Sequence, residues 1–115
     1  EAIANHVAGD NSMAKNPPKP GEGPSKEERD TGYYDIMFVG DSNEGNRLIA
    51  SVKGDRDPGY GSTSKMIAEA ALCLAIDVSR DKVPGGVYTP APAMGKELID
   101  RLSSKAGLTF TIESK

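Results

Sequence analysis

Reactive side chains gather in one short stretch, residues 53–65, where carboxylates, cations, hydroxyls and a phenol ring stand beside glycines. The stretch ends where a long apolar segment begins, and the backbone N–H groups at such a helix start attract phosphate or carboxylate. Cationic and hydroxyl side chains would add further donors. We therefore predict a site that faces a substrate, a cofactor or another anionic ligand, formed by Arg56, Asp57, Gly59, Tyr60, Ser62, Thr63 and Lys65.

The same residues also have a purely structural interpretation. Pro58-Gly59 would turn the chain, Ser62 or Thr63 would cap the helix that follows, and Tyr60 would anchor the loop to the core. Asp57 would be a solvated turn former. The residues alone leave both interpretations open, although their spacing is not that of a Walker phosphate loop.

No residue receives a catalytic role from its neighbours in the sequence. Ser62 has no histidine and aspartate placed to form a hydrolase triad, and Cys73 lies in an apolar segment without a nearby base. Because Cys73 and His6 are the single residues of their types, a zinc site built from several such ligands is excluded. The sequence therefore predicts no metal site, although a low-affinity site with oxygen ligands stays open without a loop pattern to support it.

Composition and charge limit the partners. The 17 acidic and 14 basic residues are interspersed, which argues against a basic surface for nucleic acid. The longest apolar run, Ala70 to Ile76, is far shorter than the roughly 20 residues that span a bilayer, so no transmembrane segment is predicted. A single cysteine cannot form an internal disulfide, which favours a reducing compartment and hence a cytoplasmic location.

The elements around the candidate site follow from periodicity. Alternation with a period of two predicts a β-hairpin over residues 33–54, with a polar loop at 40–46, and a closing strand over 108–112 that could pair beside it. The apolar residues expected to share one face of each strand are Tyr34, Ile36 and Phe38, then Leu48, Ala50 and Val52, and finally Leu108, Phe110 and Ile112.

Two helices are predicted between the hairpin and the closing strand. The first, over 63–78, is apolar nearly all round and is expected to be mostly buried. The second begins at about Ala93 and carries a Glu97–Arg101 pair outside, with Gly107 as its left-handed cap. The order strand, strand, helix, helix, strand predicts an α+β fold: a small, mostly antiparallel sheet with two helices packed on one face.

Domain organisation is simple at 115 residues, which suffice for one compact unit. Residues 1–31 are rich in proline and glycine and are predicted to form an irregular arm, in which Ser25 and Glu28 could make a capping box. Residues 32–115 are predicted to form the α+β domain. Since the chain opens at Glu1, we expect it to be a fragment of a longer protein.

The stretch 55–66, followed by Ala68-Glu69 and the run 71–75, resembles the carboxy-terminal part of the saccharopine dehydrogenase-like oxidoreductases. The branch that contains the trans-acting enoyl reductases is the most similar. Further matching segments are 20–25, Gly85-Gly86-Val87 and 107–110, so that the resemblance runs from about Pro17 to Phe110.

This resemblance implies a two-part full-length protein, with an amino-terminal Rossmann domain for NAD(P) and a carboxy-terminal α+β portion that shapes the substrate side and mediates homodimerisation. It also implies a small-molecule substrate, either an amino acid or a lipid enone or ketone, and hydride transfer in the whole protein. The candidate residues would then face the cofactor and substrate cleft.

Only the second part of such a protein would be present here. The dinucleotide fingerprint G-x-G-x-x-G is absent, because Gly21-Glu22-Gly23 and Gly59-Tyr60-Gly61 both lack the third glycine. The chain is therefore expected to lack the cofactor domain, to bind no cofactor and to be inactive alone. Two alternatives stay open: a stand-alone module that binds an anion or another ligand at the helix start, and a purely structural interaction domain.

Overall fold

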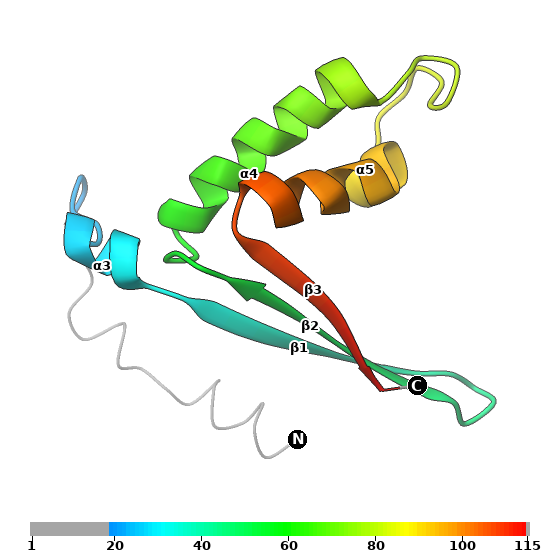
Figure 1. Cartoon of the computed structure of the whole chain (residues 1–115), viewed down its shortest axis with the longest axis horizontal. Helices are drawn as coiled ribbons and strands as arrows, with labels where there is room; N and C mark the ends of the chain where they lie inside the picture. Colours follow the sequence, from blue (N-terminus) through cyan, green and yellow to red (C-terminus); the bar gives the residue numbers. More distant parts are fainter. Residues whose placement is uncertain (1–18, 115) are drawn as a thin grey trace.

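The structure is a computed structural model that describes residues 19–114. Its elements follow the predicted order and confirm the α+β class, with the helices on one side of a three-stranded antiparallel sheet (Figure 1). The elements are α3 (Lys26–Thr31), β1 (Tyr34–Asp41), β2 (Arg47–Gly54), α4 (Gly61–Leu72), the π-helical turn η1 (Cys73–Asp77), α5 (Pro90–Lys105) and β3 (Leu108–Ser114).

The predicted arm is described only in part, since residues 1–18, His6 among them, lie outside the described residues. Helix α3 begins with the predicted capping box. The Ser25 hydroxyl accepts a hydrogen bond from the Glu28 backbone N–H, and the Glu28 carboxylate accepts one from the Ser25 N–H. The boundary between arm and domain at residue 31 stays a prediction.

The sheet has the strand order β1-β2-β3, with the predicted closing strand paired to the second strand of the hairpin. Ile36 pairs with Val52, which pairs with Phe110, and the neighbouring row joins Phe38, Ala50 and Ile112. Residues that pair directly point to the same side of a sheet, so the predicted alternation is confirmed. We call this side the apolar sheet face; its positions are Tyr34, Ile36, Phe38, Gly40, Leu48, Ala50, Val52, Gly54, Leu108, Phe110 and Ile112.

The core lies where α5 meets the sheet. Leu102, Ala106 and Leu108 are buried together, with the partly buried residues Val52, Met66, Leu98 and Phe110 packed around them. Gly107 joins α5 to β3 with a φ of 75°, the left-handed conformation predicted for it. The core is therefore small, and only the part of the sheet nearest the helices contributes to it.

Helices α4 and α5 are joined by one arginine. Arg101 of α5 donates to Glu69 of α4 at 2.7 Å and to Asp77 of η1 at 2.5 Å. The prediction that Glu97 pairs with Arg101 is wrong, since Glu97 instead pairs with Lys82. Tertiary contacts across the helix pair outweigh the weak attraction between residues four apart on one helix. Under this bridge lies the fully buried Cys73, and burial raises the pKa of its thiol.

The prediction that the first helix is mostly buried is wrong for this structure. Among the described residues, several large apolar side chains of α4 and η1 are left uncovered: Ile67, Leu74 and Ile76 are 69, 57 and 68% exposed. The helix also starts two residues earlier than predicted and ends in the π-helical turn. The apolar pattern indicates which side chains favour burial. The surface that would bury these side chains is not among the described residues.

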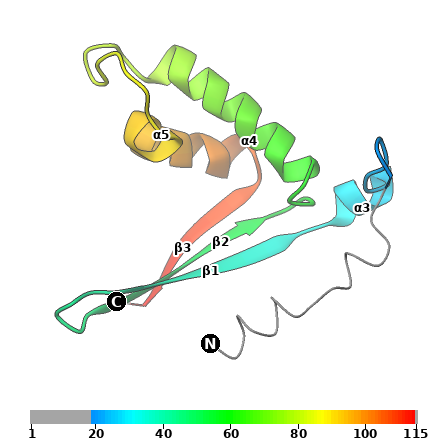
Figure 2. The same ribbon diagram turned by 180° about the vertical axis from the view of Figure 1, so that it is seen from behind.

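The molecule is open in shape. Figure 2 shows from behind that the helices cover one end of the sheet while the hairpin extends well beyond them. The radius of gyration is 17.6 Å, against about 13 Å for a compact domain of about 100 residues. The fold therefore leaves much apolar surface uncovered.

Candidate functional site

The candidate stretch forms a tight turn around one carboxylate. Asp57 accepts hydrogen bonds from the backbone N–H groups of Gly59, Tyr60 and Gly61, at 2.8, 3.1 and 2.5 Å. These groups precede or open α4, so they would otherwise lack partners at the helix start. The N-cap residue of α4 is Tyr60, and the Asp57 carboxylate supplies the hydrogen bonds to the N–H groups at the helix start that the sequence interpretation gave to Ser62 or Thr63.

The two predicted capping hydroxyls point elsewhere. The Ser62 side chain is fully buried, and its Oγ lies 2.8 Å from the Tyr34 hydroxyl of β1. The Thr63 hydroxyl donates to the Pro58 carbonyl at 2.6 Å. Ser62 thus ties the helix to the sheet, and Thr63 closes the turn from the solvent side.

Helix α3 contacts the same turn. The Asp57 N–H donates to the Arg29 carbonyl at 3.3 Å, and the backbones approach so closely that a Cβ on Gly61 would lie 2.9 Å from that carbonyl oxygen. The close approach of the two backbones therefore favours glycine at position 61. No sequence signal pointed to this contact, because it joins segments that are about 30 residues apart.

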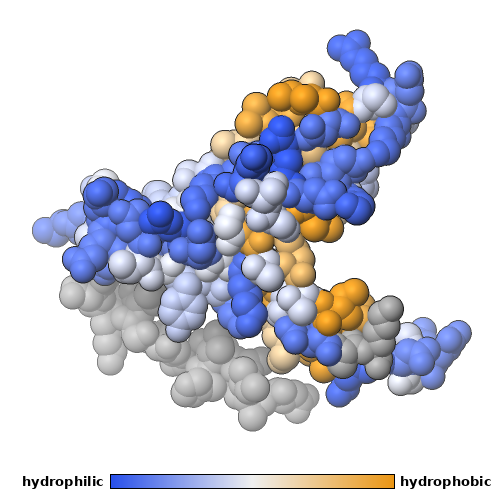
Figure 3. All heavy atoms as spheres, in the orientation of Figure 1, coloured by the Kyte–Doolittle hydropathy of each residue, from blue (hydrophilic) through white to orange (hydrophobic). Residues whose placement is uncertain are grey.

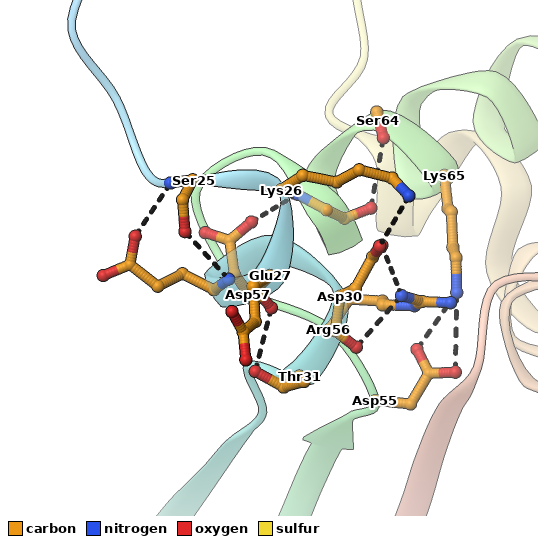
Figure 4. A network of polar contacts seen from close by, with 12 residues as sticks. Ser25, Lys26, Glu27, Asp30, Thr31, Asp55, Arg56, Asp57, Ser64 and Lys65 are labelled. Carbon is orange, nitrogen blue, oxygen red and sulfur yellow. Dashed lines mark hydrogen bonds and ion pairs between the residues drawn. The ribbon is translucent and has the colours of Figure 1, made fainter.

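The two predicted cations each have an acidic partner (Figure 4). Arg56 donates through Nη1 to the Asp30 carboxylate of α3 at 2.6 Å and to its carbonyl at 3.0 Å. Lys65 donates to the Asp55 carboxylate at 3.1 Å. Their side chains are about one third exposed, so both pairs stay within reach of solvent.

Three of the seven predicted residues share one open hollow. Arg56, Tyr60 and Lys65 line a depression of about 460 Å³. The Tyr60 ring is 60% exposed and also borders a second hollow of about 450 Å³. Ser62, Asp57, Gly59 and Thr63 do not line it. Three neighbours outside the predicted set also shape the charge here: Arg29, Asp30 and Asp55.

The hollow can hold a polar or anionic group next to an aromatic ring. An incoming carboxylate or phosphate would compete with Asp30 for Arg56 or with Asp55 for Lys65. The Tyr60 hydroxyl and ring offer a hydrogen bond and a stacking surface. These residues can bind and orient a ligand, and nothing in their contacts equips one of them as a proton-transfer base.

Backbone hydrogen bonds hold the Asp57 carboxylate in its ionised form. The bond from Gly61 lowers the pKa of Asp57 most, those from Gly59 and Tyr60 and the charge of Arg29 lower it further, and burial opposes them. A lowered folded-state pKa stabilises the fold above the ordinary aspartate pKa, and this stabilisation is lost as the pH falls through the folded value.

Asp57→Asn is therefore expected to lower the midpoint of thermal unfolding at pH 7 by several degrees, because the amide is a weaker acceptor for three N–H groups. The gap between variant and wild type should narrow as the pH falls below about 4 and Asp57 becomes protonated in the wild type. Thermal unfolding followed by circular dichroism at pH 7, 5 and 3 measures it. Asp81→Asn, in an exposed loop, is the matched control. A gap that stays constant with pH would contradict this role of Asp57.

In residues 19–114, no three metal-ligating side chains come together. No helix of this part of the chain has the length and apolarity needed to cross a membrane.

A dinucleotide cofactor does not fit these residues. Its pyrophosphate would need free N–H groups at a helix start that follows a strand of a βαβ unit. Here the strands before α4 form an antiparallel hairpin, and the Asp57 carboxylate already holds the N–H groups of the turn.

Comparison with known proteins gives several matches of one kind. The chain is 47% identical over 95 residues to a protein of Mycobacterium tuberculosis strain H37Rv named "Putative trans-acting enoyl reductase Rv2449c", a match that covers 81% of the chain and 22% of the relative. It is 40% identical over 85 residues to the trans-acting enoyl reductase of Mycobacterium ulcerans strain Agy99 and 39% identical over 85 residues to that of Mycobacterium bovis strain BCG. Both matches cover 74% of the chain and 20% of the relative.

The chain thus spans about a fifth of the length of these curated relatives. No family model matches the chain. No solved structure matches it significantly. The similarity to trans-acting enoyl reductases, predicted from the stretch 55–66 and its supporting segments, is confirmed over most of the chain.

Proposed function

We propose that this chain is the substrate-side, carboxy-terminal portion of an NAD(P)-dependent oxidoreductase of the saccharopine dehydrogenase-like type, and that it is inactive alone. One observation carries the proposal: the Mycobacterium tuberculosis relative named "Putative trans-acting enoyl reductase Rv2449c" matches about four fifths of the chain, yet the match fills only 22% of that relative. The uncovered apolar surfaces of α4 and of the sheet support it, since a complete domain buries such surfaces.

In the whole protein, the proposed reaction is hydride transfer from a nicotinamide to a C=C, C=O or imine bond, and the relatives' names favour C=C. The cofactor would be held by a Rossmann domain outside this chain. Arg56, Tyr60 and Lys65 would form one wall of the substrate cleft and orient a polar group of a small-molecule substrate, either a lipid enone or ketone or an amino acid. Homodimerisation and a cytoplasmic location complete the proposal.

The alternative of a stand-alone anion-binding module has less support. Its expected donors were the N–H groups of Ser62 to Lys65, but the Ser62 N–H donates to the Asp57 carbonyl and the Ser64 N–H to the Tyr60 carbonyl. The N–H groups just before them are held by the Asp57 carboxylate. An external anion would have to displace a ligand that belongs to the chain itself.

Titration with NADPH tests the proposed function. The 115-residue chain is expected to show no binding by fluorescence or calorimetry, while the full-length product of the reading frame that contains it should bind NADPH. Micromolar affinity of the short chain would overturn the proposal, and so would a full-length protein that binds neither NADPH nor NADH. Circular dichroism of the short chain, with and without cofactor, controls for its folding.

A further inference from the structure

The apolar sheet face is only half covered within the described residues. Near α5, Leu108 is buried and Val52 and Phe110 pack on the core. Farther along the hairpin, the same face continues through Ile36, Phe38, Leu48 and Ile112, which are 46, 52, 44 and 60% exposed. We call these four residues the outer apolar patch. Figure 3 shows apolar surface on the outer part of the sheet, next to the notch that separates it from the helices.

The composition of the two sides of the sheet shows that this patch is no ordinary solvent-facing surface. None of the eleven positions of the apolar sheet face carries a charge, including those beyond the helices. The opposite side is mixed: Lys53 pairs with Asp35, Arg47 pairs with Asp41, and Ser51 donates to Glu113. The opposite side also exposes Met37 and Val39, but only the apolar sheet face is free of charge along its whole length, as expected of the side of a sheet that is covered.

The area of the patch favours a covering element from the same polypeptide. The four side chains expose roughly 400 Å², taking about 200 Å² for each when fully exposed. A stable complex buries about 800 Å² on each partner, so the patch alone is too small to hold a second copy. A segment of the same chain needs no such area, because its effective concentration is high.

The additional length of the relatives is enough to contain such a segment. They are about five times as long as the matched region, so most of the polypeptide in such a protein lies outside this chain. We propose that the outer apolar patch is the seat of an apolar helix or strand from the rest of the same polypeptide, which continues the layer begun by α5. This rests on the proposed function, and it adds which face of the chain the remainder covers.

Two neighbouring positions on β1 test the proposal in the full-length protein. Phe38 belongs to the patch, whereas Met37 lies on the opposite side and is 68% exposed. With Cys73 buried, the thiol introduced by Phe38→Cys is expected to react with a maleimide at least about tenfold more slowly than that introduced by Met37→Cys. Peptide mass spectrometry assigns the labelled positions, and both thiols should react freely in the 115-residue chain.

Each outcome of the labelling experiment either supports or overturns the proposal. Equal labelling of the two thiols in the folded full-length protein would overturn the proposal. Protection of Phe38→Cys that disappears when light scattering shows dilution to a monomer would assign the patch to a second copy, and would also overturn it. Loss of the fold by Phe38→Cys but not by Met37→Cys supports it, because only a packed side chain is so costly to truncate. An NADPH titration of the same samples shows separately whether the proposed function holds.

Discussion

Leu102→Ala is expected to unfold the 115-residue chain at room temperature. Leu102 is 8% exposed and is one of five buried apolar residues among those described, with Cys73, Met94, Ala106 and Leu108. Truncating a buried leucine costs about 2–5 kcal/mol, since transfer energy is lost and a cavity remains. A small core supplies about 3–5 kcal/mol of net stability, so this single cavity is comparable to the whole.

Urea unfolding followed by circular dichroism measures the effect, with Ile99→Ala as the matched control. Ile99 lies on the same helix three residues earlier and is 44% exposed, so its truncation should cost less than about 1 kcal/mol. If the two variants unfold at the same urea concentration, the core does not lie where α5 meets β3. In the full-length protein the loss from Leu102→Ala should be similar, but it should not unfold the molecule.

Gly54→Ala is expected to cause the second largest loss in the free energy of unfolding. Gly54 is buried on the central strand directly opposite Tyr34, whose ring lies across it. A Cβ on Gly54 would lie 2.2 Å from a carbon of that ring, so the ring would have to move and its hydroxyl would leave Ser62. Overpacking of this kind costs about 1–3 kcal/mol, and the lost hydrogen bond adds to it.

Gly40→Ala is the control for this substitution, because it lies in the same hairpin and a Cβ there would meet nothing closer than 4.0 Å. It should leave stability unchanged or raise it slightly, since alanine restricts the unfolded chain. The double variant Gly54→Ala with Tyr34→Ala should recover part of the loss by making room for the methyl group. A Gly54→Ala protein as stable as the Gly40→Ala protein would show that the Tyr34 ring does not occupy this position.

Much of the fold follows from local pattern alone. Alternation with a period of two predicted which residues share a face within each strand, such as Ile36 with Phe38 and Phe110 with Ile112, because side-chain direction in a strand does not depend on the partner strand. That the faces of the three strands coincide comes from their pairing. Gly107 was predicted in the left-handed conformation because helix ends favour glycine there. Both features depend on residues close together in the chain.

The features that sequence reasoning missed depend on residues far apart. Asp57, rather than Ser62, accepts the hydrogen bonds at the start of α4, because the turn brings the carboxylate back onto the N–H groups while the helix packs Ser62 against the sheet. Arg101 finds its partners on α4 and η1 rather than on its own helix. The exposure of α4 was missed for another reason: hydrophobicity cannot tell whether the covering surface lies in the same chain.

The strand order has a consequence for how the chain assembles in time. β1 and β2 are joined by a loop of five residues, whereas β2 and β3 pair Val52 with Phe110 across the whole helical segment. Closing a short loop loses little chain entropy, and closing a long one loses more. The hairpin can therefore form early, while β3 docks only after α4 and α5 have met. During synthesis, the sheet would stay two-stranded until the last residues of this segment leave the ribosome, and its apolar side would need protection for that interval.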